Sequence, residues 1–301
     1  MHIALTGASG LIGSALMPAL AASGHQVTQL VRRPAAAGQA RWDPAGGQLD
    51  PAVLGGVDAV VHLAGAPLDR GHTAAQRAVI RDSRVDSTRL LAETVAGMPA
   101  DARPGVLVCA SGSNYYGDHG EEPVTEDDAP RGGGFMSQLA RDWEAAADSA
   151  RSAGVRVVHV RTGIVLAPEG DALRRLLPFA KLGLLGSFGS GRQYWPWIAP
   201  DDIVGLYLLA LEDERVSGPL NGSAPNPVTN AALTRTLAGV LHRPVFPVPI
   251  PRFAPGVVVG PKVAGELLYA SVRMVPARAQ ELGYEFRFPE LEPALRAVLG
   301  R

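Results

Sequence analysis

The chain begins Met1-His-Ile-Ala-Leu-Thr-Gly-Ala-Ser-Gly-Leu-Ile-Gly13, an apolar run that leads into regularly spaced glycines. Residues 3–5 predict a buried strand, and the amphipathic residues 11–20 predict a helix. A helix N-terminus presents unpaired N–H groups and a partial positive charge, which suit a pyrophosphate. Glycines let the backbone turn sharply and approach phosphates. The stretch therefore predicts a dinucleotide-binding turn made by Gly7, Ser9, Gly10, Leu11, Ile12 and Gly13.

The end of the second predicted strand, residues 26–31, indicates which dinucleotide is bound. Arg32 and Arg33 follow it, and no Asp or Glu occurs before Asp43. NAD-binding folds usually place an acid at this point to hold the ribose 2′-OH. An acid would repel a 2′-phosphate, whereas a guanidinium binds one in a bidentate manner. We therefore expect NADP(H), held by Arg32 and Arg33; the alternative is that both are solvated charges.

Composition narrows the function classes. The chain has 301 residues, 47% of them hydrophobic, and a net charge of −1, which argues against nucleic-acid and membrane partners. Cys109 is the single cysteine and lies in an apolar run, which indicates packing and a reducing, cytoplasmic location. His62 also lies in an apolar run and is interpreted as a core histidine. The histidines show no spacing typical of a metal site.

The order of predicted elements favours one architecture. Apolar strands alternate with helices through the first half, which is typical of an α/β fold with a doubly wound parallel Rossmann sheet. We expect strands at 2–6, 26–31, 58–63, 106–110, 155–160 and 245–248, and helices at 11–23, 73–97, 135–153, 171–182, 201–213, 229–241 and 290–299.

Two regions are expected from this order. Residues 1–170, joined by 200–214, form the NADP(H)-binding domain. Residues 171–199 and 215–301 form a smaller C-terminal α+β lobe over the carboxyl ends of the strands, with a substrate cleft between the two regions. Residues 218–227 are rich in Pro and Gly and are interpreted as turns.

Motifs along the whole chain carry a family resemblance. They are Thr6-Gly-Ala-Ser-Gly-Leu-Ile-Gly13, Asp58-Ala-Val-Val-His-Leu-Ala-Gly65, Tyr116-Gly117, Arg161-Thr-Gly-Ile-Val-Leu166 and Trp197-Ile-Ala-Pro-Asp-Asp-Ile-Val204. In these the chain resembles the extended, epimerase-like branch of the short-chain dehydrogenase/reductase superfamily. With Arg141-Asp-Trp-Glu144 and Leu282-Gly-Tyr-Glu-Phe-Arg-Phe-Pro289 it resembles, more narrowly, the atypical epimerase family proteins. The resemblance implies a substrate lobe and further cofactor residues at Leu63, Ala64, Gly65, Arg84 and Thr162; the alternative for Arg84 is a charge pair on a helix face.

The chain departs from this superfamily at its proton-transfer pair. Active members carry Tyr-x-x-x-Lys on a helix, where the lysine lowers the pKa of the tyrosine. Here Phe135 takes the tyrosine place and Leu139 the lysine place, and neither Lys181 nor Lys262 follows a tyrosine by four residues. The usual hydroxyl position falls on Gly112, so Ser111 is our candidate beside it.

Tyr116 is the candidate replacement acid, because it follows the strand at the expected cofactor edge. The alternative is that Tyr116 is a structural wall residue whose hydroxyl is hydrogen-bonded. Glu144 is interpreted as solvated or paired with an arginine.

The function expected from these observations is an NADP(H)-dependent reductase of a small carbonyl, enone or quinone. Such acceptors polarise easily, which fits the loss of the Tyr/Lys pair. Two alternatives remain: a non-catalytic NADP(H)-binding sensor or partner-binding protein, and a nucleotide-sugar epimerase or dehydratase, which would need the missing base. We expect a small-molecule substrate and consider a homodimer possible through the helices after the fourth and fifth strands.

Overall fold

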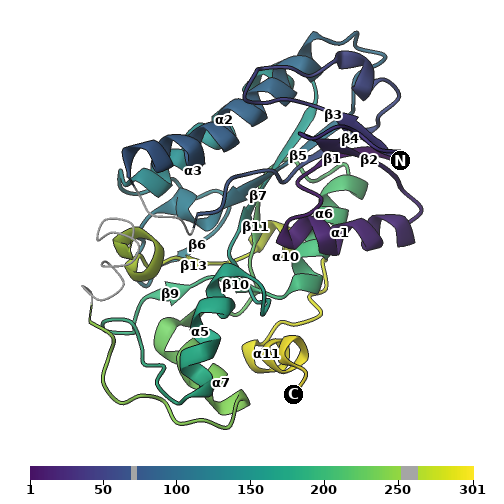
Figure 1. The fold of residues 1–301 in the computed structure, drawn as a ribbon. Coiled ribbons are helices and arrows are strands. Elements are labelled where there is room, and N and C mark those ends of the chain that lie inside the picture. The colour runs from purple at the N-terminus through teal and green to yellow at the C-terminus, as the bar shows by residue number, and fades with distance from the viewer. Residues whose placement is uncertain (69–72, 252–263) are drawn as a thin grey trace.

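A computed structural model describes residues 1–68, 73–251 and 264–301 (Figure 1). Its centre is a seven-stranded sheet in the order β11-β7-β5-β4-β1-β2-β3, with all neighbours parallel. The strands are β1 (His2–Thr6), β2 (Gln26–Val31), β3 (Gln39–Arg41), β4 (Ala59–His62), β5 (Val106–Gly112), β7 (Arg156–Thr162) and β11 (Gly218–Gly222). The order reverses between β1 and β4, which is where open α/β sheets bind ligands. The expected doubly wound Rossmann sheet is thus confirmed.

Helices cover both faces of this sheet. On one face lie α1 (Leu11–Ala22) and α6 (Pro200–Glu212); on the other lie α2 (Ala74–Gly97), α3 (Phe135–Ala145) and α4 (Asp148–Ser152) (Figure 1). Strand β1 shows the alternation that this requires, because Ile3 and Leu5 enter the core under α1 and α6 while Ala4 enters the core under α2. Both cores are apolar, which explains the continuous apolar runs in the sequence.

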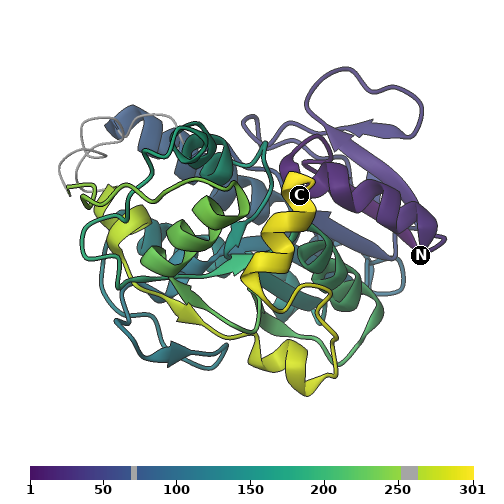
Figure 2. The same ribbon diagram turned by 90° about the horizontal axis from the view of Figure 1, so that it is seen from below.

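A smaller lobe lies below the carboxyl ends of the strands. Its helices are α5 (Asp171–Lys181), α7 (Asn230–Val240) and α11 (Leu291–Leu299), and α11 lies beside α7 when seen from below (Figure 2). Short strand pairs complete it: β8 (Ile164–Val165) with β10 (Trp197–Ile198), β9 (Tyr194–Trp195) with β12 (Val228–Thr229), and β6 (Pro123–Val124) with β13 (Arg273–Met274). Its core gathers Leu173, Trp197, Leu237 and Leu295.

Several boundaries differ from the sequence prediction. Residues 218–222 were expected in turns of the smaller lobe, but they form β11, the edge strand of the main sheet, and α10 (Ala277–Glu281) packs on it. Proline is tolerated on an edge strand, which is why Pro219 misled the prediction. The helix expected at 135–153 is broken into α3 and α4, and residues 245–248 form no strand. Lys262 lies outside the described residues. Within the described ranges, no helix is both long and apolar enough to cross a bilayer.

The glycine turn brings α1 against the end of β1. Gly7 has φ of +72°, and a Cβ on it would lie 2.7 Å from the Leu63 carbonyl carbon. A Cβ on Gly13 would lie 2.2 Å from the Gly7 carbonyl oxygen, closer than any non-bonded contact allows. Only glycine therefore fits at both positions, because the obstacle in each case is backbone that cannot swing away.

We expect Gly13→Ala to lower the free energy of unfolding by roughly 2 kcal/mol or more, because the added methyl group overpacks a backbone contact. Urea denaturation measures this. The matched control is Gly239→Ala in α7, where a Cβ meets nothing within 4 Å, so this variant should gain up to about 1 kcal/mol. Equal stability of the two variants would contradict the packing argument.

Candidate functional site

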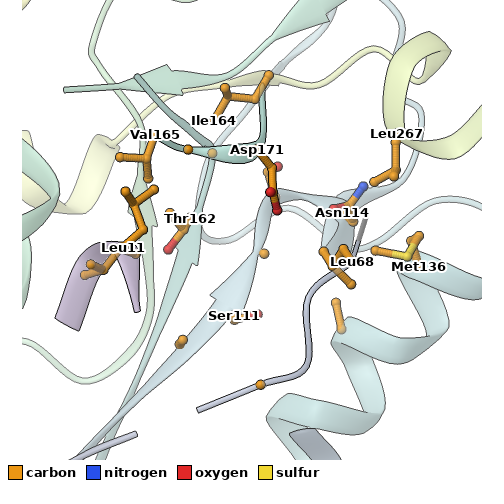
Figure 3. Close-up of a pocket in the computed structure, with 18 of the residues that line it drawn as sticks. Leu11, Leu68, Ser111, Asn114, Met136, Thr162, Ile164, Val165, Asp171 and Leu267 are labelled. Carbon is orange, nitrogen blue, oxygen red and sulfur yellow. The ribbon is translucent and has the colours of Figure 1, made fainter. Parts of the chain in front are cut away.

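A cavity of about 590 Å³ lies along the carboxyl ends of the central strands (Figure 3). Its wall runs from the glycine turn, past the ends of β5 and β7, to the smaller lobe. Figure 3 shows Thr162 and Ser111 from the sheet facing the same space as Asp171 of α5 and Leu267 of the π-helix η3 (Gly265–Tyr269). Both regions of the fold therefore build the site.

Most of the sequence-predicted site residues meet in this wall. The lining includes Gly7, Gly10, Leu11, Ile12, Gly13, Leu63, Gly65, Arg84, Ser111 and Thr162. Ser9, Ala64 and Tyr116 do not line it. Arg32 and Arg33 lie outside it as well; both are exposed, and neither has an ion pair or hydrogen bond within the described ranges. Their position at the end of β2 leaves them accessible to a charged ligand.

The start of α1 suits an anion. Gly10 caps this helix without a side-chain hydrogen bond, and the first turn contains no acidic residue. The first N–H groups of the helix are therefore not satisfied by capping side chains and face the cavity formed around Gly10 to Gly13. This arrangement fits the pyrophosphate of a dinucleotide.

A buried chain of polar groups holds the loop that follows β4. Ser87 Oγ donates its proton to the Ser83 carbonyl at 2.7 Å, so it accepts from Nε2 of His62 at 3.0 Å. Nδ1 of His62 then accepts from Thr6 Oγ1 at 2.7 Å. The Thr6 oxygen in turn accepts the N–H of Leu63 and of Ala64 at 3.1 and 3.2 Å. The backbone N–H of Ala64 thus helps to hold the loop that forms this part of the cavity wall. His62 is the core histidine expected from the sequence.

Arg84 places a positive charge in the cavity wall without a carboxylate partner among the described residues. Its side chain is 8% exposed, packs against Gly65 and lies over the Trp143 ring at 5.2 Å. Its Nη1 donates a hydrogen bond to the Ile80 carbonyl oxygen at 3.1 Å. Burial lowers the pKa of Arg84 to about 10, so it stays charged at neutral pH. Arg89 of the same helix pairs with Asp86 at 3.0 Å, but within the described ranges Arg84 takes part in no such pair, so its charge is available to a ligand in the cavity.

Ser111 is held by a buried ion pair. Its hydroxyl donates to Glu144 Oε1 at 2.7 Å, and both oxygens of Glu144 accept from Arg161, Nε and Nη2, at 2.9 Å. Burial opposes the charge on Arg161, but the hydrogen bonds and charge of Glu144 outweigh it and raise the pKa of Arg161. Glu144 is therefore paired with an arginine, one of the two alternatives expected. Because the Ser111 hydroxyl proton is donated to Glu144, only the hydroxyl oxygen of Ser111 can form a hydrogen bond with a ligand, and it does so as an acceptor.

Tyr116 belongs to the same network but lies behind the cavity wall. Its side chain is fully buried, its hydroxyl donates to Asn221 Oδ1 at 2.7 Å, and it accepts from Arg161 Nη1 at 2.9 Å. Burial raises the pKa of Tyr116 to about 12, against a smaller opposing effect of Arg161. A phenol so placed neither touches the cavity nor ionises near neutral pH. These contacts favour the structural-wall alternative over the acid.

Comparison with known proteins places this arrangement in a family. Residues 3–221 match the NAD dependent epimerase/dehydratase family, and residues 250–298 match a domain of unknown function, DUF1731. The chain belongs to the NAD dependent epimerase/dehydratase family. The epimerase family protein SDR39U1 of Homo sapiens is 38% identical over 308 residues, covering 99% of this chain and 100% of its own. The epimerase family protein Mb2239 of Mycobacterium bovis is 40% identical over 295 residues, covering 97% and 96%.

Solved structures give the same assignment. The crystal structure of human SDR39U1, isoform 2, with NADPH aligns with a TM-score of 0.88 at 35% identity over 100% of both chains. The nucleoside-diphosphate sugar epimerase from Corynebacterium glutamicum aligns with a TM-score of 0.81 at 36% identity, over 100% of this chain and 58% of that one. The resemblance to epimerase family proteins is thus confirmed.

The helix that should carry the superfamily's proton-transfer pair has none here. Leu139 lines the cavity, and Phe135 begins α3. The backbone N–H groups of Phe135 and Met136 are instead capped by the Glu266 carboxylate, at 3.0 and 2.6 Å. Glu266 thereby ties the smaller lobe to α3. Sequence reasoning missed it because residue 266 is far from α3 in the chain.

Other polar groups of the wall were not predicted either. Asn114, Asp171 and Tyr194 line the cavity, and Asp171 accepts from Arg174 at 3.1 Å. Asn114 follows β5 directly, which is a signal that could have found it. Among the residues that the structure describes, no three His, Cys, Asp or Glu side chains gather as metal ligands do.

Buried histidines make stability depend on pH. Burial, with a smaller contribution from the Arg84 charge, lowers the pKa of His62 from 6.5 to about 3, and burial lowers that of His159 to about 4. The unfolded chain takes up these protons below pH 6.5 and the folded chain does not. We expect the free energy of unfolding to keep its full value above pH 6.5. As the pH is lowered from there, it should decrease by up to about 1.4 kcal/mol per pH unit for each of the two histidines.

Urea denaturation between pH 7 and pH 5 tests this expectation. Between pH 6.5 and pH 5, the free energy of unfolding of the variant His62→Asn should decrease by about 2 kcal/mol less than that of the parent protein, because one buried histidine is missing. This difference does not depend on how stable the variant is at pH 7. The control His242→Asn changes an exposed histidine and should keep the slope of the parent protein. An unchanged slope in His62→Asn would show that His62 is not the group responsible.

Proposed function

We propose that the protein binds NADP(H) along the described cavity and reduces a small, easily polarised carbonyl compound. The observation that carries the proposal is a cavity that begins at an uncapped helix N-terminus and continues beyond it to Thr162 and Trp195. The human relative with NADPH, similar over its full length, supports the choice of cofactor.

The residues present fit this cofactor. The Gly10–Gly13 turn would hold the pyrophosphate, Arg32 and Arg33 the 2′-phosphate, and the wall from Leu63 to Gly65 would pack on the remainder. When bound, NADPH supplies hydride. Arg84 adds positive charge beside this wall, where low exposure strengthens its interaction with an anionic group.

The protein's own groups limit the reaction. Ser111 offers an oxygen as acceptor and can orient a hydroxyl group, while Phe135 and Leu139 hold no transferable proton. Without the tyrosine–lysine pair, the product oxygen takes its proton from water or from another polar group of the wall, such as Tyr194. An enone or quinone tolerates this better than a plain ketone, because its charge is delocalised when hydride adds.

A second candidate is non-catalytic NADP(H) binding, and the apolar residues at the two proton-transfer positions favour it. Turnover distinguishes the two candidates. Oxidation of NADPH by a panel of aldehydes, enones and quinones supports the reductase, whereas tight NADPH binding with no acceptor in the panel supports the sensor.

We expect NADPH to bind at least about tenfold more tightly than NADH, because a guanidinium pair contacts the 2′-phosphate. Titration followed by tryptophan fluorescence measures both affinities. The double variant Arg32→Ser/Arg33→Ser should bring the two affinities together, while the control Arg235→Ser, an exposed arginine on α7, should not. Equal binding by the parent protein would refute the arginine assignment, and no binding of either nucleotide would refute the cofactor.

We expect Tyr116→Phe to lower the free energy of unfolding by about 1–3 kcal/mol, because Asn221 and Arg161 lose a buried partner. Its rate of NADPH oxidation should equal that of the parent protein. The control Tyr284→Phe removes a hydroxyl bonded to the Asp202 carbonyl at 3.2 Å, away from the cavity, and should behave likewise. A rate loss of tenfold or more in Tyr116→Phe alone would return Tyr116 to the catalytic residues.

A further inference from the structure

A second cavity, of about 1020 Å³, adjoins the first. It lies between α5 and two loop segments, residues 184–188 and 246–251. Its walls are formed mainly by aliphatic and aromatic side chains: Leu176, Pro178, Phe179, Leu184, Leu185, Phe188, Phe246, Val248, Ile250 and Leu268. We call this cavity the apolar groove. Among the described residues, its charged side chains are Asp171, Arg174 and Arg175, of which Asp171 and Arg174 pair with each other.

The apolar groove and the cofactor cavity share part of their walls. The residues common to both are Leu11, Leu68, Gly163, Ile164, Val165, Asp171, Trp195 and Leu267. Figure 3 shows the side chains of Leu11, Leu68, Ile164, Val165 and Leu267 facing this common space. A molecule in the groove can therefore reach the end of β7, where the cavity of the proposed cofactor continues. This continuity identifies the occupant as a small molecule that meets the cofactor.

The mouth of the groove exposes large apolar side chains. Phe179, Leu184 and Val248 are 56%, 51% and 57% exposed, and Phe246 is 40% exposed. Leaving such side chains in water is unfavourable, and a cluster of them marks a binding site. Together with the buried lining, they select a ligand by its apolar surface.

We propose that the apolar groove binds the non-reacting part of the substrate, an alkyl chain or fused apolar ring, while its carbonyl group enters the cofactor cavity. This rests on the reductase function proposed above and gives its substrate class. A nucleoside diphosphate suits the groove less well, because most of the wall is aliphatic or aromatic and phosphates would lose hydration against it. The volume matches that of pockets for molecules of drug size.

Displacement of a fluorescent apolar probe tests the groove without turnover. The protein loaded with NADP⁺, which cannot reduce a ketone, is saturated with 1-aminoanthracene and titrated with hexan-2-one, octan-2-one and decan-2-one. Each added methylene should tighten binding about fourfold, the gain expected for a buried CH₂ group. Affinity that does not rise with chain length would overturn the proposal, as would displacement by UDP-glucose at lower concentration than by decan-2-one.

Variants at the exposed mouth keep the core intact. In Phe179→Gln/Val248→Gln, decan-2-one should bind at least tenfold more weakly, while the affinity for NADPH stays the same. Val79→Gln is the control, because Val79 is 59% exposed on α2 and lines neither cavity. Unchanged decan-2-one affinity in the double variant, or an equal loss in the control, would contradict the assignment.

The two proposals fail in different ways. Ketone binding that strengthens with chain length, without NADPH oxidation by any acceptor, supports the groove and refutes the reductase. NADPH oxidation at a rate independent of chain length, without probe displacement, supports the reductase and overturns the groove. Adsorption of the protein to phosphatidylcholine vesicles without ketone binding would also overturn it, because the exposed side chains would then serve a lipid surface.

Discussion

The buried guanidinium of Arg161 joins more of this structure than any other group described above. It pairs with Glu144 of α3, donates to Tyr116 and lies over the Tyr115 ring at 3.4 Å. Through Tyr116 the chain of contacts reaches Asn221 on β11, the edge of the sheet. Two charges this deeply buried cost desolvation, which is offset when both carboxylate oxygens and the guanidinium are hydrogen-bonded, as they are here. The pair therefore ties the carboxyl ends of β5 and β7 to α3, directly behind the part of the cavity wall that Ser111 forms.

This network explains why the sequence left two interpretations of Tyr116 open. Tyr116 follows β5, and that position alone makes it a candidate acid. Its hydroxyl donates to Asn221, which lies on β11. This strand was not predicted, because Pro219 and the glycines at its two ends break the usual strand pattern. Because this edge strand was not predicted, the hydrogen-bond partner of the Tyr116 hydroxyl was not predicted either. The burial of a hydroxyl depends on partners distant in the chain, which local patterns do not contain.

The phosphate-binding end of the site was predictable for the opposite reason. The Gly7–Gly13 turn needs a strand, a left-handed glycine and a helix within thirteen residues, and each is a local property. The strands expected at 2–6, 26–31, 58–63 and 106–110 and the helices expected at 11–23 and 73–97 were likewise confirmed, because their apolar runs and amphipathic stretches are long. The smaller lobe was predicted in outline only. Its strands have two residues each, too short for a period to show, and contacts such as that of Glu266 with α3 join segments far apart in sequence.

The two ends of the site also differ in the forces available for binding. Around the glycine turn and Arg84, helix N–H groups and an unpaired cation favour anions. Across the residues shared by the two cavities, the walls become aliphatic, and binding depends on the removal of apolar surface from water. Low polarity at the aliphatic end disfavours any ligand group that must carry charge there. Leu139, which stands in the place of the lysine, lines the cofactor cavity and adds to its apolar wall.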